Sequence, residues 1–176
     1  MRLLLGLLLL HSVVVGYNSF HIDIVRYQSS KGLLKNVSGC DFRGAGSLLQ
    51  GVNFANVQMS GVLFCPCKKQ SDVAGVECTP NQVTDLTGIN FSGATLVNAN
   101  FIDAILKGTD FSGADIMYAN FSGADLTGAK LDDAVNATTA IFCNATMPNG
   151  SQCSQKSWTS KSGKVFLCHC PKKSQS

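Results

Sequence analysis

The stretch from Thr84 to Asp133 reads TDLTG INFSG ATLVN ANFID AILKG TDFSG ADIMY ANFSG ADLTG AKLDD, ten consecutive units of five residues. The central residue of every unit is large and apolar, and the residue two places before it is small or β-branched. Neither the 3.6-residue period of a helix nor the two-residue alternation of a strand produces this spacing. A five-residue period suits a chain that turns a corner after each unit, so four units complete a square coil and the coils stack into a solenoid.

An earlier stretch continues the same period. SLLQG VNFAN VQMSG VLFCP follows it from Ser47 to Pro66, and KNVSG CDFRG before it places Val37 and Phe42 at unit centres after a two-residue slip. Residues 67–83 break the period, so we expect them to project as a loop from one corner of the coil. Loops on a rigid scaffold often carry function, but a tolerated surface insertion explains this one equally well.

These units resemble those of the pentapeptide-repeat family, whose consensus is A-D/N-L/F-x-x; ADLTG, TDFSG, ANFSG and ANFID are close matches. The resemblance covers roughly residues 35–66 and 84–133. It implies an all-β fold, a right-handed quadrilateral parallel β-helix (a pentapeptide-repeat solenoid), here with a corner loop insertion and irregular ends. The segment TAIFCNATMPNGSQC that follows resembles the tail found at the end of many chains of this family.

Stacking units four apart, at about 4.8 Å per coil, places like residues above like. The predicted interior columns are Leu86/Leu106/Leu126, Phe91/Phe111/Leu131, Leu96/Ile116 and Phe101/Phe121. Continuing the period would put Asn136 in the third column, where a buried amide lacks hydrogen-bond partners. We therefore expect the regular coil to end near Asp133 and a cap to follow over residues 134–153.

The N-terminus predicts export. Met1–Gly16 contains a basic residue, an apolar run and a small-residue end, the pattern of a signal peptide. An uncleaved anchor is the alternative, but a spanning helix needs about 20 apolar residues, and polar residues begin at Tyr17. We expect a secreted, lumenal or periplasmic protein with no membrane span after cleavage.

The chain has eight cysteines, which behind an export signal favours disulfides. The shortest loops pair Cys143 with Cys153, and Cys78 with either Cys65 or Cys67. A metal site built from Cys65, Cys67, Cys168 and Cys170 is the weaker alternative, because C-x-C is not a usual zinc spacing. We expect no metal and no cofactor.

Catalytic groups are scarce in the sequence. Beyond the signal peptide the chain offers only His21, His169 and Glu77. Four of the seven aspartates of the main repeat block immediately precede a central residue, where side chains face solvent. No phosphate-binding loop, nucleophile elbow or histidine-rich metal motif is present. The sequence therefore predicts no catalytic residue. A hydrolase with a site between the loop and the tails is the alternative.

One outward face of the coil is apolar. It includes Val97, Met117 and Tyr118, whereas the neighbouring sides carry mostly polar residues. An apolar strip on a polar rod is typical of a contact surface, so we predict an unknown protein partner or self-association there. The alternative is that the C-terminal segment with Trp158 and Phe166 covers this strip. Some family members with acidic rods mimic DNA, but export argues against a nucleic-acid partner.

Six N-x-S/T sequons start at Asn36, Asn90, Asn120, Asn136, Asn144 and Asn149. Those at Asn36, Asn90 and Asn120 follow from the repeat consensus itself, so only the three later sequons carry independent weight. Of these, Asn144 and Asn149 are the glycosylation candidates.

The predicted organisation is a signal peptide (1–16), an N-terminal segment (17–34), two repeat blocks (35–66 and 84–133) around a loop (67–83), a cap (134–153) and a basic, partly disordered tail (154–176). The predicted function is a non-enzymatic, secreted protein-interaction or scaffold module. Besides the hydrolase, a glycan-binding or surface-binding protein is an alternative.

Overall fold

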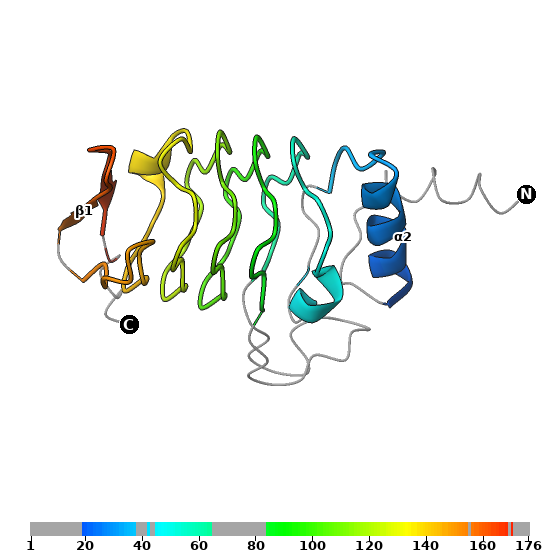
Figure 1. The fold of residues 1–176 in the computed structure, drawn as a ribbon, viewed down its shortest axis with the longest axis horizontal. Coiled ribbons are helices and arrows are strands. Elements are labelled where there is room, and N and C mark those ends of the chain that lie inside the picture. The colour runs from blue at the N-terminus through cyan, green and yellow to red at the C-terminus, as the bar shows by residue number, and fades with distance from the viewer. Residues whose placement is uncertain are drawn as a thin grey trace, which may run out of the picture.

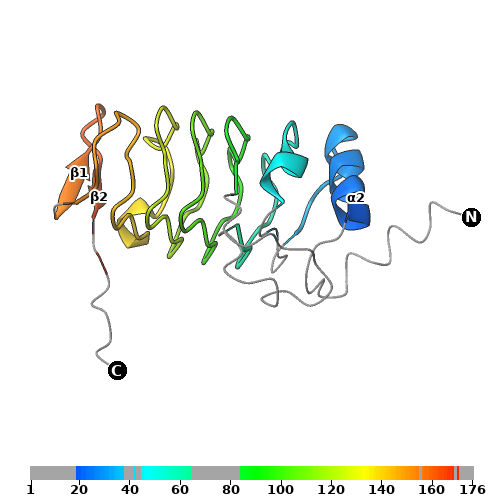
Figure 2. The same ribbon diagram turned by 90° about the horizontal axis from the view of Figure 1, so that it is seen from below.

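The computed structural model describes residues 19–37, 42, 45–64, 84–154, 156–168 and 170. They form a row of stacked coils with helix α2 (Ser19–Ser30) at one end (Figures 1 and 2). The antiparallel pair β1 (Ser157–Thr159) and β2 (Val165–Leu167) lies at the other end. Two short 3₁₀ helices, Gly46–Leu49 and Ala137–Thr139, interrupt the coils.

Single-residue parallel bridges join each coil to the next. Within the main repeat block they connect residues 20 positions apart, as in Asp85↔Ile105, Asn90↔Asp110, Thr95↔Asp115 and Asn100↔Asn120. Twenty residues are four units, so the predicted register is confirmed. The earlier block joins the same ladder through Asn53↔Asn90, and Asn36↔Gln58 shows the two-residue slip before it.

The unit Thr109–Gly113 shows why the chain turns every five residues. The amide of Ala114 donates to the carbonyl of Phe111 at 3.0 Å, and Gly113 adopts φ 67°, as a type II turn requires. The Oδ1 atom of Asp110 accepts the amide of Ser112 at 2.9 Å. Where the residue before a centre is Asp or Asn, it thus closes the next turn, a role that the sequence analysis did not assign to it.

Aromatic stacking fills two sides of the interior. The rings of Phe64, Phe101, Phe121 and Phe142 form one column, with successive centroids 5.1, 4.9 and 5.1 Å apart. Phe54, Phe91 and Phe111 form a second column with spacings of 5.4 and 5.5 Å. All seven side chains are fully buried. Burial of each ring contributes about 2–3 kcal/mol to folding, so the columns hold the coils in register.

The ladder continues past Asp133, which differs from the predicted end of the coil. Val135 pairs with Asp115 at the usual spacing, but Ile141 and Thr146 pair with Asn120 and Asp125, 21 residues away. One extra residue is therefore inserted between Val135 and Ile141. Asn136 turns outward with φ 57°, and Ala137, which is 2% exposed, is buried in its place. The argument against a buried Asn136 was correct, but an insertion resolves it without ending the coil.

The ends of the solenoid are covered by elements that the sequence analysis did not predict. At the N-terminal end the Ser29 hydroxyl of α2 accepts the Asn53 amide at 2.8 Å and donates to the Asn53 carbonyl at 3.1 Å. At the other end Phe166 of β2 is fully buried and packs edge-on against Phe142, with centroids 5.6 Å apart. The residues expected to be a partly disordered tail thus include an ordered hairpin that protects the last coil.

The predicted Cys143–Cys153 disulfide is wrong. Cys143 is bonded to Cys170, and Cys153 to Cys168. Cys153 is buried with the core, whereas Cys143 is only partly buried, so the two side chains face different surroundings although Asn144 and Cys153 are paired through their backbones. The chain folds back on itself, and the two bonds join it to the hairpin in a nested pattern that loop length alone does not indicate.

Several predictions concern residues outside the described ranges. These are the signal peptide over 1–16, the loop over 67–83, and Cys65, Cys67 and Cys78. Within the described ranges, no helix has the length and apolar character needed to cross a bilayer.

Candidate functional site

The apolar strip predicted from the sequence lies on one side of the coils. Val97 and Met117 are neighbours in adjacent coils, since the Asn98 amide donates to the Met117 carbonyl at 2.9 Å, and both are partly exposed. Tyr118 is 56% exposed, and Val135 in the next coil is 47% exposed. We call these four residues the apolar strip. They expose apolar side chains on three successive coils, although Val135 lies in the ladder position of Asp115 rather than in that of Met117.

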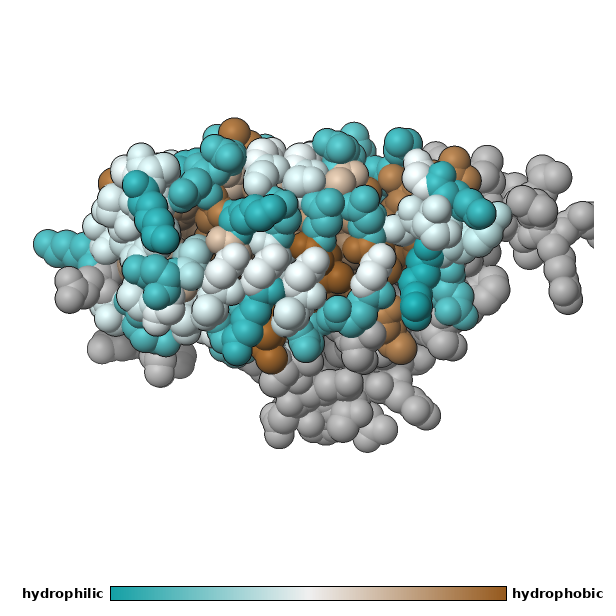
Figure 3. All heavy atoms as spheres, viewed as in Figure 1, coloured by the Kyte–Doolittle hydropathy of each residue, from teal (hydrophilic) through white to brown (hydrophobic). Residues whose placement is uncertain are grey.

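Large exposed apolar residues are few elsewhere among the described residues. Besides Tyr118 and Val135 they are Tyr27, Leu33, Leu48, Val165 and Leu167, which lie in or near the end elements. Hydrophilic and pale residues dominate the face in Figure 3, and brown residues occupy small areas between them. The strip is therefore a local feature of the repeat region.

Tyr118 also has an unfavourable backbone conformation. Its φ of 57° is left-handed, and the equivalent position of the units on either side is Gly113 and Gly123. A side chain in this region costs about 1–2 kcal/mol relative to glycine. Its amide is satisfied by the Thr139 hydroxyl at 3.1 Å. Folding alone favours glycine at this position, so a tyrosine here needs another explanation.

The C-terminal segment, which the sequence offered as an alternative cover for the apolar strip, forms the hairpin at the end of the solenoid. Phe166 packs on Phe142 at the end of the solenoid, and Trp158 lies 5.3 Å from Phe166 between ring centroids. The ammonium of Lys164 donates to the carbonyls of Asp132 and Ala134, which holds the hairpin there. Tyr118 and Val135 stay exposed beside the hairpin, so the prediction that this segment covers the strip is wrong.

The acidic residues form local pairs. Lys130 Nζ lies 2.9 Å from Asp110 Oδ2, and this hydrogen bond, with those from Ser112, lowers the pKa of Asp110 to about 2. Burial raises the pKa of Asp125, but hydrogen bonds from Thr127 and Lys107 outweigh it, so the net shift is downward. Both carboxylates are therefore charged at neutral pH, which makes neither a general acid.

Metal ligands are not clustered in the part of the chain that the structure describes. Over the described residues, no group of three or more His, Cys, Asp and Glu side chains could hold a metal ion. Glu77 and His169, two candidates of the hydrolase alternative, lie outside these residues.

Both glycosylation candidates are exposed. Asn144 lies in a left-handed turn with φ 55°. The Oδ1 atom of Asn149 accepts the amide of Ser151 at 3.1 Å, its hydroxyl at 2.7 Å and the indole N–H of Trp158 at 3.2 Å. All three bonds use the oxygen of the Asn149 side chain, and none uses its amide nitrogen, the atom to which an N-linked glycan is attached.

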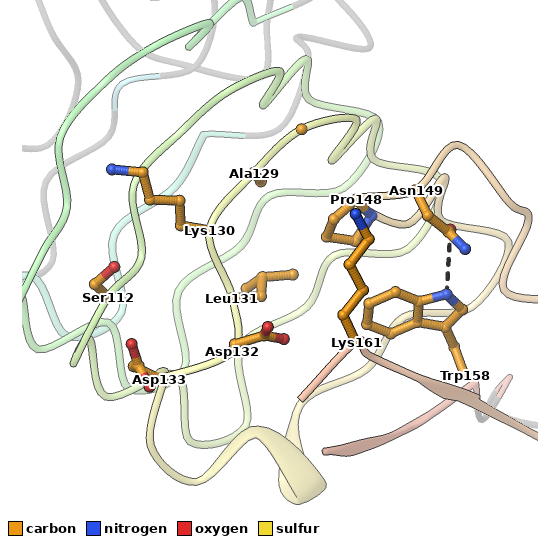
Figure 4. Close-up of a pocket in the computed structure, with 11 residues that line it drawn as sticks. Ser112, Ala129, Lys130, Leu131, Asp132, Asp133, Pro148, Asn149, Trp158 and Lys161 are labelled. Carbon is orange, nitrogen blue, oxygen red and sulfur yellow. Dashed lines mark hydrogen bonds between the residues drawn. The ribbon is translucent and has the colours of Figure 1, made fainter. Parts of the chain in front are cut away.

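A groove of about 410 Å³ separates the last coils from the hairpin (Figure 4). Lys130, Leu131 and Asp132 run along one wall, whereas Trp158 and Lys161 come from the hairpin, with Pro148 and Asn149 between them. The sequence analysis named none of these as groove residues. Trp158 is the single tryptophan of the chain, which is the only signal that could have singled it out.

Comparison with known proteins identifies the repeats. Residues 84–117, 94–133 and 119–148 match the model of the pentapeptide repeats, in eight copies. Residues 84–148 therefore consist of repeats of the pentapeptide-repeat family. Proteins of this family form right-handed quadrilateral β-helices and are generally non-enzymatic structural or interaction modules. The match extends to residue 148, as the continued ladder does.

Three solved pentapeptide-repeat proteins are similar to this chain. HetL, involved in heterocyst differentiation regulation in the cyanobacterium Nostoc, is 23% identical over 66% of this chain and 55% of its own, with a TM-score of 0.33. A protein from the thylakoid lumen of Arabidopsis thaliana is 21% identical over 76% and 78%, with a TM-score of 0.38. Rfr23 from the cyanobacterium Cyanothece is 22% identical over 57% and 76%, with a TM-score of 0.29.

The pentapeptide-repeat chain spans 55% of the length of HetL. A search of curated protein sequences found no match to this chain.

Proposed function

We propose that this protein is a non-enzymatic, secreted scaffold that binds a protein partner, or a second copy of itself, through the apolar strip. The observation that carries the proposal is Tyr118, whose side chain is 56% exposed on a left-handed backbone. A residue that weakens the fold and stays exposed is a candidate for a role in binding. Tyrosine is also among the residues that contribute most at protein interfaces.

The shape of the strip suits such a contact. Val97, Met117 and Val135 come from three consecutive coils, which repeat at about 4.8 Å, and ladder hydrogen bonds hold their backbones. A rigid surface loses little conformational entropy on binding. We infer the family's right-handed quadrilateral coil for this chain, with the flat sides that such a contact uses.

Two variants test the strip without relying on damage to the fold. Tyr118→Gly removes the ring and relieves the left-handed backbone, so the free energy of unfolding should stay equal or rise by about 1 kcal/mol. The double variant Val97→Ser/Met117→Ser removes the partly exposed apolar side chains. Thr87→Ala, on a neighbouring polar side, is the matched control.

Self-association is measured by sedimentation equilibrium, and partner binding by capture from the protein's own compartment with the disulfides intact. Both strip variants should lose association while Thr87→Ala keeps it. Retention of the same oligomer and the same captured protein by Tyr118→Gly and by the double variant would refute the proposal.

We also propose export and glycosylation at Asn144 or Asn149. The disulfides Cys143–Cys170 and Cys153–Cys168 support export, because such bonds persist in oxidising compartments. The exposure of both asparagines supports glycosylation. Expression through a eukaryotic secretory pathway, followed by removal of N-glycans, should give a mass loss that Asn144→Gln and Asn149→Gln together abolish. Retention inside the cell, or an unchanged mass, would count against it.

A further inference from the structure

We propose that the groove between the last coils and the hairpin binds a neutral oligosaccharide. The site is separate from the apolar strip, and none of the strip's residues lines it. Its volume of about 410 Å³ falls in the usual range for small-ligand sites, roughly 300–1,000 Å³.

Trp158 supplies an aromatic surface whose position is fixed. Its indole N–H donates to Asn149 Oδ1 at 3.2 Å, and its ring packs against the buried ring of Phe166. The side chain is partly exposed, and it lines the groove. The electron-rich face of an indole attracts the weakly positive C–H groups of a sugar ring. Because the N–H is already used, Trp158 offers the groove a stacking surface more than a hydrogen-bond donor.

The hairpin that carries Trp158 is attached firmly to the solenoid. Two disulfides join its C-terminal side to Cys143 and Cys153, and Lys164 donates to two carbonyls of the coil. The ring therefore keeps its distance from the opposite wall without a ligand. Such preorganisation lowers the entropic cost of binding.

The polar groups of the groove favour a neutral ligand. Asp132 and Asp133 carry negative charge, and Lys130 and Lys161 carry positive charge. Lys130 is already paired with Asp110 at 2.9 Å, which leaves no positive excess to attract a sulfate or phosphate. Ser112 and Asp132 occupy the same outward column in successive coils and offer hydrogen-bonding groups about 4.8 Å apart. Sugar hydroxyls both donate and accept hydrogen bonds, so they suit this mixture.

The single tryptophan makes the test direct, because intrinsic fluorescence of the full, disulfide-intact chain reports on this groove alone. Protein made without N-glycans is titrated with chitotetraose, cellotetraose and maltotetraose, and separately with a heparin-derived tetrasaccharide. We expect a saturable blue shift with at least one neutral sugar and a Kd of about 1 mM or lower.

Asp132→Ala should weaken that binding at least about tenfold, as loss of a charged hydrogen-bonding group does. Trp158→Ala should abolish it, as measured by calorimetry. Asp85→Asn, an aspartate in the first coil of the main repeat block, is the matched control and should bind like the native chain. Since Asp132 is exposed, its loss should leave thermal unfolding unchanged.

Three results would overturn the proposal. These are no saturable change with any neutral sugar at about ten times the expected Kd, a response to heparin alone, and equal binding by Asp132→Ala and the native chain. None of them bears on association through the apolar strip, so the proposed function is tested separately.

Discussion

The side-chain amide of Asn136 donates a hydrogen bond of 2.9 Å to Oδ1 of Asp115, in the adjacent coil. The same oxygen accepts the amide of Met117 at 3.1 Å. This contact compensates for the residue inserted after Val135. The extra side chain, Asn136, points outward and donates to the carboxylate that closes the turn at Met117 in the adjacent coil. The insertion is thereby accommodated without a break in the ladder.

Asp115→Ala should therefore destabilise the protein more than Asp85→Ala. Asp85 Oδ1 accepts the Thr87 amide at 2.9 Å and serves as the matched site without the second donor. We expect losses of about 2 and about 1 kcal/mol in the free energy of unfolding, respectively. Urea denaturation measures both. In a double-mutant cycle with Asn136→Gly, which tolerates the left-handed backbone, a coupling energy near zero would show that the contact contributes nothing.

Phe121 stacks between Phe101 and Phe142, with ring centroids 4.9 and 5.1 Å away. The loss in the free energy of unfolding should therefore depend on the size of the residue that replaces it. Phe121→Ala should cost about 3–5 kcal/mol, because the rings above and below would line a cavity. Phe121→Leu should cost less, about 1–1.5 kcal/mol, since Leu131 already follows Phe111 in the other column. Thermal and urea unfolding distinguish the two. Equal losses for both variants would argue against ring stacking as the source of stability.

The nested disulfides predict a specific peptide map. Proteolysis without reduction should yield fragments joining Cys143 to Cys170 and Cys153 to Cys168. The sequence separations of 27 and 15 imply contributions of about 3.5 and about 3 kcal/mol in the chain-entropy model. Cys153→Ser/Cys168→Ser should lower the melting temperature and shift Trp158 emission to the red, since Trp158 lies on the attached hairpin. Recovery of a Cys143–Cys153 fragment would contradict this pairing.

The pair of Lys130 and Asp110 predicts acid sensitivity. The pKa of Asp110 is lowered from 3.8 to about 2 in the folded chain. A depressed carboxylate pKa stabilises the fold above its unfolded value, so this contribution is present at neutral pH and lost as the pH falls from about 4 to about 2. The contribution is on the order of 1 kcal/mol after allowing for solvent screening.

Lys130→Met should remove the largest part of that contribution at pH 7, while the bonds from Ser112 remain, and should have little effect at pH 2, as measured by urea denaturation at both values. Lys107→Met is the comparison variant and should lose less at pH 7, because its 3.2 Å contact with Asp125 is longer and contributes less to the lowered pKa of that carboxylate. A loss of the same size at pH 2 would show that Lys130 stabilises the fold by some other means than its charge.

The sequence predicts the structure of the regular coils better than that of the two ends of the solenoid. The register of Leu86 to Leu131 follows from the period alone, because each unit repeats the same local turn and each coil contacts only its neighbours. Asn136 shows the limit of that reasoning. The burial argument at this position was correct, but whether the chain stops or inserts a residue depends on Ile141 and Phe142, which resume the ladder and the ring column.

The candidate sites divide in the same way. Val97, Met117 and Tyr118 were located by counting outward positions, although the left-handed backbone of Tyr118 became apparent only in the structure. The groove was not predicted, since Trp158 is 26 residues beyond Asp132 in the sequence. No periodicity relates a hairpin to the coil it covers.

The sequence by itself determined the solenoid, its register and its apolar strip, because a five-residue repeat specifies the same turn, interior residue and neighbour at every step. The tertiary structure decided the insertion at Asn136, the disulfide pairing and the groove at Trp158. These depend on the two ends of the stack, where exposed core and backbone groups must be covered by whatever segments can reach them. Phe166 against Phe142 and Ser29 against Asn53 are two such contacts, and neither follows a local rule.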